Sequence, residues 1–397
     1  MSIIEGECPM QKSLVIAIAA VLTAVLAPPS TGQSVFPLGT TVWDQGAASA
    51  GYTVFPASNG LLVMIDMDGT IVNTWSSPIP GQILQNGEPL EAGRVLSFSN
   101  VPGSAGPREL VELDWDGNTV WSYSAPPAIW SLHHDMERLE NGNTLILANE
   151  HFSIGYPTDL EDDVILEVDP AGNVVWEWRT FEHAHQFGFT PTAVEHAIAL
   201  LEPLAGDWAH ANAIAVLPPN DHTDPALAAG NIVVSQRTTN VVFILDRQTG
   251  AVVWHTDPND PLTYGNHNPT MIPLGFEGAG NILVFDNGAG TGYGPIRFAR
   301  GYSRVIEIDP TTMEVAWEYK ASKHGNFDRE FYSDVVSGAQ RLANGNTLAV
   351  EGVMGRIIEV DRDGQIVWEH MTDQVSTAAV ARRLIYRAHR VPYAFAP

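Results

Sequence analysis

Cysteine is almost absent from this chain of 397 residues, which contains Cys8 alone. A single thiol excludes an internal disulfide and any site that holds a metal through several cysteine thiolates. Basic residues are also scarce, because 20 Lys and Arg stand against 46 Asp and Glu, a formal net charge of −26. This acidic surplus argues against a nucleic-acid-binding protein, which needs cationic groups to displace counterions from phosphates. It also argues against docking on an anionic membrane surface.

Long apolar stretches are missing too, apart from one near the N-terminus. Residues 13–27 are apolar or small throughout, a run that is short for a membrane span and typical of the core of a signal peptide. Met10 is an alternative start that gives a shorter leader without acidic residues, and an uncleaved membrane anchor is the alternative interpretation. We expect residues 1–27 to be a signal peptide and the mature protein to be periplasmic or secreted.

Turn-forming and aromatic residues, in contrast, are abundant. The chain has 35 Gly, 27 Pro and 11 Trp, and hydrophobic residues make up 45% of it while charged residues make up 17%. This composition can build a large core and excludes a charge-swollen disordered chain. Many turns with many aromatics favour an all-β protein, and a closed β architecture can absorb this length as one domain.

One sequence pattern recurs six times along the chain. Each copy has an alternating apolar strand, a turn that contains Asp and usually Gly, a second apolar strand and a Trp. The turn Asp and the Trp of the copies are Asp66 and Trp75, Asp114 and Trp121, Asp169 and Trp176, Asp246 and Trp254, Asp309 and Trp317, and Asp361 and Trp368.

A second motif precedes the first in most copies. It is a tight Asn-Gly or Gly-Asn turn followed by an apolar run, found at residues 141–147, 230–234, 280–285 and 344–350. Each repeat therefore contains four strands in roughly 50 residues, as in a propeller blade. The sequence predicts a six-bladed β-propeller.

The repeat also sets the expected boundaries of the domains. We expect a signal peptide at 1–27, an N-terminal segment at 28–54, the propeller at 55–390 and a short C-terminal tail at 391–397. The repeated Trp residues are predicted to pack between blades. The Asp turns look like half of a calcium loop but lack its downstream Glu, so we interpret them as turn chemistry, with one bound calcium ion as the alternative.

Histidines break the repeat at one position. Blade three has His133 and His134, blade four His210 and blade five His267 just before the innermost strand, whereas residues 332–337 of blade six have none. Strand alternation makes His133 and His134 face opposite ways, so we assign the channel-facing place to His134. A single His on a strand is usually structural, but three at one repeat-relative place predict a functional site at the mouth of the channel.

Arg237 decides between two interpretations of these histidines. Three His could hold zinc with one open position. A cation such as Arg237 beside a dication is repulsive, whereas Arg and His together can grip a tetrahedral oxyanion. We therefore expect an anion pocket without metal or cofactor, in which one His is a nucleophile and another an acid or base.

The motifs around these residues resemble those of the bacterial arylsulfate sulfotransferases, over about residues 55–390. They are, in chain order, His134-Asp135, Asp207-Trp208-x-His210-x-Asn212, Ser235-x-Arg237, Asn266-His267 and Phe285-Asp286-Asn287-Gly288.

The resemblance implies a six-bladed propeller enzyme that moves a sulfuryl group from an aryl sulfate donor to a phenolic acceptor, without a nucleotide sulfate donor. It implies that His267 attacks sulfur and becomes a transient sulfohistidine. It also implies that Arg237, His210 and Asn212 hold the sulfuryl oxygens and that His134 exchanges the proton. We add His133 to the substrate-binding residues.

The chain departs from the best-known members of that family. Only residues 28–54 separate the expected leader from the first blade, where those members carry an extra β-domain, so we expect a monomer or a homodimer. Asn268-Pro269 follows His267 where an acidic residue is expected. The alternative function is a non-catalytic exported propeller that serves as a binding or scaffolding module.

Overall fold

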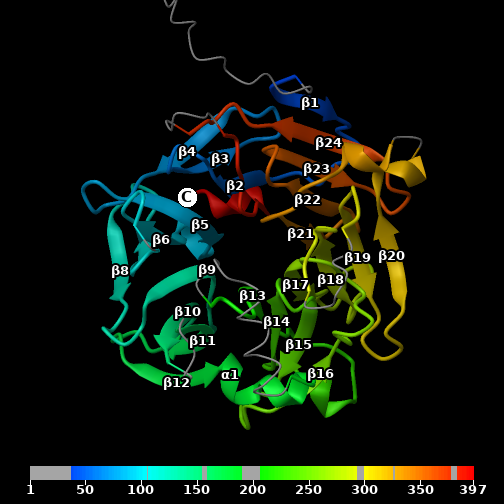
Figure 1. Ribbon diagram of the computed structural model, residues 1–397. Helices are drawn as coiled ribbons and strands as arrows, with labels where there is room; N and C mark the ends of the chain where they lie inside the picture. Colours follow the sequence, from blue (N-terminus) through cyan, green and yellow to red (C-terminus); the bar gives the residue numbers. More distant parts are fainter. Residues whose placement is uncertain are drawn as a thin grey trace, which may run out of the picture. The chain divides into compact units, whose positions relative to one another are not determined.

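The computed structural model describes residues 37–104, 106–153, 159–189, 206–292, 299–324, 327–376 and 382–397, and the expected signal peptide lies outside them. Six antiparallel sheets form the blades of a ring that follows the order of the sequence (Figure 1). The prediction of an all-β, six-bladed propeller is confirmed. Among the described residues, no helix has the length and apolar character needed to cross a bilayer.

The strands of the first three blades are given from the central channel outward. Blade one contains β25 (His389–Val391), β2 (Tyr52–Pro56), β3 (Leu62–Ile65) and β4 (Ile71–Trp75). Blade two contains β5 (Ile83–Pro89), β6 (Val95–Asn100), β7 (Glu109–Leu113) and β8 (Thr119–Ser124). Blade three contains β9 (Ser131–Arg138), β10 (Thr144–Phe152), β11 (Leu160–Val168) and β12 (Val174–Arg179).

The other three blades follow the same plan. Blade four contains β13 (Ala211–Val216), β14 (Ile232–Gln236), β15 (Val241–Leu245) and β16 (Val252–His255). Blade five contains β17 (His267–Met271), β18 (Ile282–Asp286), β19 (Arg304–Ile308) and β20 (Val315–Tyr319). Blade six contains β21 (Gly338–Arg341), β22 (Thr347–Glu351), β23 (Arg356–Val360) and β24 (Ile366–Met371), with β1 (Gly39–Trp43) added at its outer edge.

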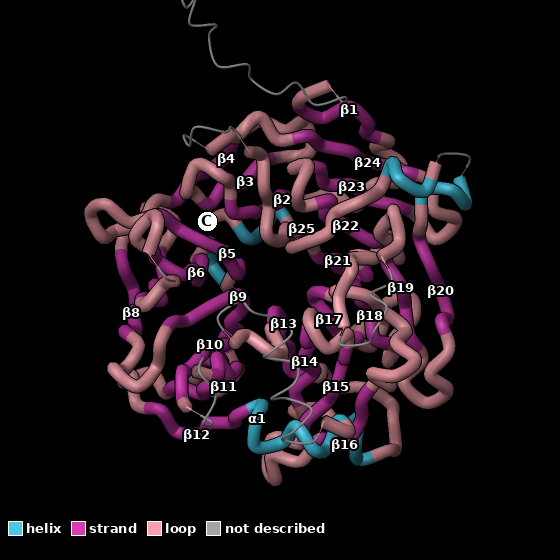
Figure 2. The backbone as a smooth tube through the Cα atoms, viewed as in Figure 1, coloured by secondary structure: helices cyan, strands magenta, loops and turns pink. Residues whose placement is uncertain are grey.

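The helical segments are short and lie between strands or after the last one (Figure 2). They are the α-helix α1 (Thr180–His183) and the 3₁₀ turns η1 (Glu91–Gly93), η2 (Ala184–Phe187), η3 (Pro225–Leu227), η4 (Ala321–His324), η5 (Asp328–Glu330) and η6 (Tyr393–Phe395).

The Asp turns form as turn chemistry predicts. In blade one, Oδ1 of Asp66 accepts hydrogen bonds from the backbone N–H groups of Asp68 (3.0 Å) and Thr70 (2.9 Å). Gly69 adopts a left-handed φ of 87°, which a residue with a side chain would rarely take. The carboxylate and the glycine together close the hairpin between β3 and β4.

The ring closes through β25, which comes from the C-terminal end of the chain. β25 pairs with β2 of blade one, where Val391 faces Tyr52. Arg390 extends from β25 to Glu359 of blade six, 3.2 Å away, and both side chains are buried. The last strand therefore completes the first blade and ties it to the sixth.

The repeated Trp residues join neighbouring blades, as predicted. Their indole N–H groups donate to a backbone carbonyl in the next blade's Asp turn, and four of them use the residue directly after the turn Asp. The pairs are Trp121 with Pro170, Trp254 with Pro310, Trp317 with Arg362, and Trp368 with Met67. In blade three the donor is Trp178 and not the repeat residue Trp176, and its acceptor is Gly250.

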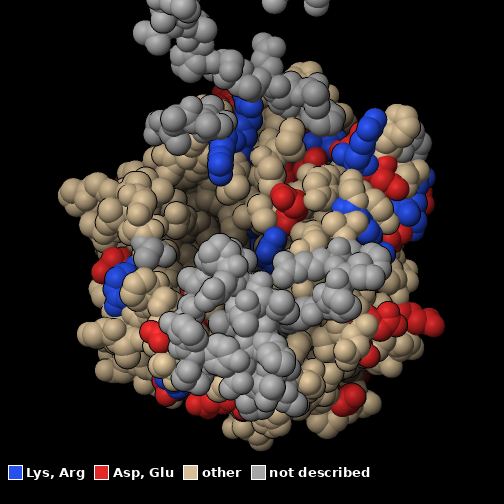
Figure 3. Space-filling model, in the orientation of Figure 1, with Lys and Arg blue, Asp and Glu red and all other residues tan. Residues whose placement is uncertain are grey.

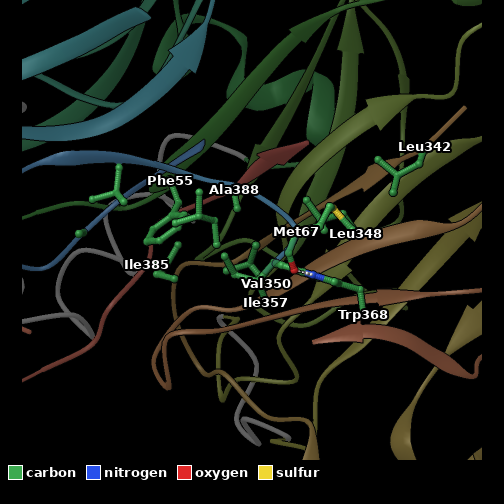
Figure 4. Packing of buried hydrophobic residues seen from close by; sticks show 12 residues of the cluster. Phe55, Met67, Leu342, Leu348, Val350, Ile357, Trp368, Ile385 and Ala388 are labelled. Atoms are coloured by element: carbon green, nitrogen blue, oxygen red, sulfur yellow. Dashed lines mark hydrogen bonds between the residues drawn. The ribbon is translucent and has the colours of Figure 1, made fainter. Parts of the chain in front are cut away.

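Apolar side chains fill the spaces between blades. Figure 4 shows the cluster between blades one and six, in which Phe55 and Met67 meet Leu348, Ile357 and Trp368. These side chains are at most 2% exposed. Such packing between blades fixes how the innermost strands are placed around the channel.

Candidate functional site

Neighbouring innermost strands bring the three predicted histidines together. His134 lies in β9, His210 directly precedes β13 and His267 begins β17. The ring centroids of His134 and His210 are 4.8 Å apart, at an interplanar angle of 73°. His210 and Arg237 contribute to the lowered pKa of His267, so His267 also lies near them.

A bulge in β9 overturns the expectation that only one of the two adjacent histidines faces the site. The register between β9 and β10 shifts at this point, and His134 has a left-handed φ of 57°. The strict alternation of side chains is lost at such a bulge. His133 and His134 both line the same cavity, and their Nδ1 atoms are 2.8 Å apart.

The surroundings of His267 fix its tautomer. Its Nδ1 lies 3.0 Å from the carbonyl oxygen of Gly265 and 2.7 Å from Oδ1 of Asn287. The amide nitrogen of Asn287 donates to the carbonyl oxygens of Ser333 (2.8 Å) and Val336 (2.9 Å), so its oxygen must face His267. Because both neighbours accept, Nδ1 carries the hydrogen and Nε2 holds the lone pair.

His267 is also kept uncharged. The side chain is 2% exposed, and burial lowers its pKa to about 3, to which the nearby Arg237 and His210 contribute. The imidazole is therefore neutral at physiological pH. A buried, neutral imidazole with one free nitrogen is the form that a nitrogen nucleophile needs.

Asp207 orients His210. Its carboxylate makes a short hydrogen bond to Nδ1 of His210. Burial acts to raise the pKa of Asp207, but the charge and hydrogen bond of His210 outweigh it and leave the pKa below its ordinary value. The carboxylate thus holds the ring with Nε2 turned away from Asp207.

Arg237 follows the end of β14 beside His210. Its backbone N–H donates to the carbonyl oxygen of His210 (2.9 Å), and Nη2 lies 3.4 Å from the carbonyl oxygen of Asp334. The pKa of His134 lies well below its ordinary value, chiefly through burial and also through His210, His133, His267 and Arg237. The predicted cation is therefore close enough to act on the histidines.

Asn212 lies beneath these groups and not at a free surface. Its side chain is fully buried; Nδ2 donates to the carbonyl oxygen of Asn266 (2.8 Å), and Oδ1 accepts from the hydroxyl of Ser235 (2.5 Å). The amide therefore links blade four to the residue before His267. This contact positions His267 and uses the polar atoms that a sulfuryl group would need.

A cavity of about 570 Å³ opens over this cluster. The imidazoles of three histidines and the carboxylates of three acidic residues line one part of it: His133, His134, His210, Glu161, Asp163 and Asp207. The other part is largely apolar. The apolar wall comes mainly from blades one and two and includes Pro56, Ile83, Leu84, Phe98 and Pro107. Figure 3 shows one face of the ring hollowed near its middle, with Lys or Arg side chains at the edge of the hollow.

Three predicted site residues do not line this cavity. Among the described residues, its walls do not include His267, Arg237 or Asn212. Asn268, where the resemblance leads one to expect an acidic residue, has a left-handed φ of 51°, and its Oδ1 accepts from the backbone N–H of Ala339 (3.0 Å). Asn268 thus ties blade five to blade six.

Sequence reasoning missed the roles of Asp207, Asn287 and Asp163. The first two stand in the motifs quoted for the resemblance, so their positions were visible but not their contacts. Asp163 lies in β11, thirty residues after His133. Only the pairing of β11 with β10, and of β10 with β9, brings it near the site.

A family model for arylsulfotransferases (ASST) matches residues 52–261 and 255–379. The chain belongs to the arylsulfotransferase family. This membership supports an arylsulfotransferase-type function, with an aryl sulfate as donor and a phenol as acceptor. No curated protein matches the chain.

Solved structures were found that match this member of the arylsulfotransferase family. A protein of unknown function from Bacteroides caccae is 15% identical, with a TM-score of 0.53, over 86% of this chain and 98% of that one. An inactive variant of virginiamycin B lyase from Staphylococcus aureus, solved with quinupristin, is 9% identical, with a TM-score of 0.40, over 88% and 99% of the two chains. The first of these matches bears on the fold alone, because its identity is low.

Proposed function

We propose that this protein transfers a sulfuryl group from an aryl sulfate ester to a phenolic acceptor through a sulfohistidine on His267, in the periplasm or outside the cell. The observation that carries the proposal is the fixed tautomer of His267, with Nδ1–H held by Asn287 and Gly265 and a lone pair on Nε2. Family membership supplies the class of reaction.

In the first half-reaction, Nε2 of His267 attacks sulfur while the bond from sulfur to the aryl oxygen breaks. The departing phenolate takes a proton from Nε2 of His134, which lines the cavity. Arg237 and His210 stabilise the negative charge on the sulfuryl oxygens during the transfer. Asn212 contributes by positioning the start of β17.

In the second half-reaction, a phenol occupies the place of the first product. His134 takes the phenolic proton, the phenol oxygen attacks sulfur, and the bond from sulfur to Nε2 of His267 breaks. The low pKa of His267, about 3, makes this nitrogen a good leaving group. The same burial that keeps the nucleophile uncharged therefore also favours its release.

A transfer assay tests the proposal. Purified protein is given 4-nitrophenyl sulfate and phenol, and both released nitrophenol and phenyl sulfate are measured. We expect transfer by the wild type, a loss of at least about 10³-fold for His267→Ala, and little change for His185→Ala, whose imidazole is exposed. Equal rates for wild type and His267→Ala would contradict the proposal.

A further inference from the structure

A buried carboxylate stands behind the two adjacent histidines of β9. Oδ1 of Asp163 lies 3.4 Å from Nε2 of His133. Nδ1 of His133 lies 2.8 Å from Nδ1 of His134. Three ionisable side chains thus form a row along one wall of the cavity, which all three line.

The carboxylate is held in place by its other oxygen. Oδ2 of Asp163 accepts a hydrogen bond of 2.7 Å from the backbone N–H of Ala211, directly after His210. Asp163 is 5% exposed. One carboxyl group therefore fixes the start of β13 and leaves Oδ1 toward His133.

We propose that Asp163 and His133 form a proton relay that supplies His134 with the proton for the departing phenolate and stores the proton taken from the acceptor. The inference rests on the proposed function and adds two residues to it. His133 then acts through His134, as a positioning and relay residue, and not as the substrate-binding residue that the sequence suggested.

Each proton moves between neighbouring groups of the row. The last move crosses the 3.4 Å contact between Oδ1 of Asp163 and Nε2 of His133, a nitrogen that makes no hydrogen bond to the described residues. At the start, the Asp163 carboxyl group carries a proton, His133 carries one on Nδ1 and His134 one on Nε2. The phenolate takes the Nε2 proton of His134, Nδ1 of His134 takes the proton of His133, and Nε2 of His133 takes the proton of Asp163. At the end Asp163 is a carboxylate, both imidazoles are neutral, and Nε2 of His134 is free to accept the phenolic proton.

Such a relay suits the charges around it. His210, His267 and Arg237 all face His134, and together with its burial they make an imidazolium there unfavourable. The relay never charges either imidazole. Burial raises the pKa of Asp163 well above its ordinary value, and Asp207, Asp162 and Glu161 act in the same direction, so its surroundings favour the protonated carboxyl group.

The dependence on the leaving group distinguishes a relay from a structural role. Phenyl sulfate releases a strongly basic phenolate that needs a proton, whereas 4-nitrophenyl sulfate releases a weakly basic one. For His133→Gln and for Asp163→Asn, we expect kcat/KM to fall about 10²-fold or more with phenyl sulfate and less than about tenfold with 4-nitrophenyl sulfate. Two variants are used because Asp163→Asn also touches the backbone of β13.

His185→Gln is the matched control. His185 is exposed and makes none of the relay's contacts, so both donors should keep their wild-type rates. Equal losses with both donors in His133→Gln would overturn the relay while leaving the transfer reaction intact. Failure of the wild type to transfer from either donor would instead contradict the proposed function.

Discussion

The side-chain amide of Asn287 determines which ring nitrogen of His267 carries the lone pair. Asn287 accepts from Nδ1 of His267 because its own N–H groups are held by two backbone carbonyls. An aspartate at position 287 would place a negative charge 2.7 Å from Nδ1. A nearby opposite charge stabilises the protonated imidazole, so the pKa of His267 should rise from about 3 toward 6.5 or above.

We therefore predict that Asn287→Asp moves the acid limb of the kcat/KM profile upward. In the proposed reaction His267 can attack only when neutral, so activity should be lost as the pH falls through the raised pKa. In the wild type this imidazole stays neutral down to about pH 4. The measurement is kcat/KM with 4-nitrophenyl sulfate between pH 4 and 9. Asn287→Ala serves as the control, since it should lower the rate without moving the limb upward. An unmoved limb in Asn287→Asp would contradict the assigned contact.

Sequence patterns located His134, His210 and His267 but not their immediate partners. Alternation could not show that both His133 and His134 face the cavity, because it assumes a regular strand and His134 adopts a left-handed conformation. Such a backbone angle has only a weak sequence signal when the residue is not glycine, since few histidines adopt it.

The hydrogen bond from a Trp in the outer strand to the Asp turn of the next blade recurs in most blades. The four Trp residues that use the same acceptor position occupy equivalent places in the outer strands, and in blade one Asn73 takes that place by donating to the carbonyl oxygen of Trp115 (2.9 Å). The sequence repeat predicted this packing because the Trp follows the Asp turn within a few residues, so each copy of the repeat contains the whole pattern. It misplaced blade one, where Trp75 lies two residues beyond the repeat position and donates to the carbonyl oxygen of Asp114. In blade three Trp176 keeps the repeat position, but the donor is Trp178.

Removing one such contact should weaken the fold measurably. Trp317 donates to the carbonyl oxygen of Arg362 and lies 5.1 Å from the guanidinium groups of both Arg341 and Arg362. We expect Trp317→Phe to reduce the free energy of unfolding by about 1–2 kcal/mol, since the hydrogen bond and the better cation–π partner are lost.

Urea unfolding at constant m measures this change. Trp130→Phe is the control, because Trp130 is 47% exposed and should lose less than about 0.5 kcal/mol. A Trp317→Phe variant as stable as that control would show that the contacts between blades contribute little.

At the scale of the whole molecule, the number of blades was predictable and the closure of the ring was not. Six copies of one pattern indicate six blades, but nothing in the pattern shows that β25 completes blade one or that β1 extends blade six. Those pairings join residues more than 300 positions apart, such as Tyr52 and Val391. Local patterns carry no information on such distant contacts.

The net charge of −26 also has a clearer meaning at this scale. Arg237 lies among the histidines at the site, and its positive charge can attract the sulfate ester that an acidic surface would otherwise repel.

The most direct test of the central claim is to look for the covalent intermediate. The protein is mixed with 4-nitrophenyl sulfate without an acceptor, quenched at alkaline pH to spare the bond from nitrogen to sulfur, digested and analysed by mass spectrometry. The account predicts one added sulfuryl group on the peptide that contains His267, its loss when phenol is added, and its absence in His267→Ala. A wild type that transfers sulfuryl groups while this peptide stays unmodified, or is modified at another residue, would contradict it.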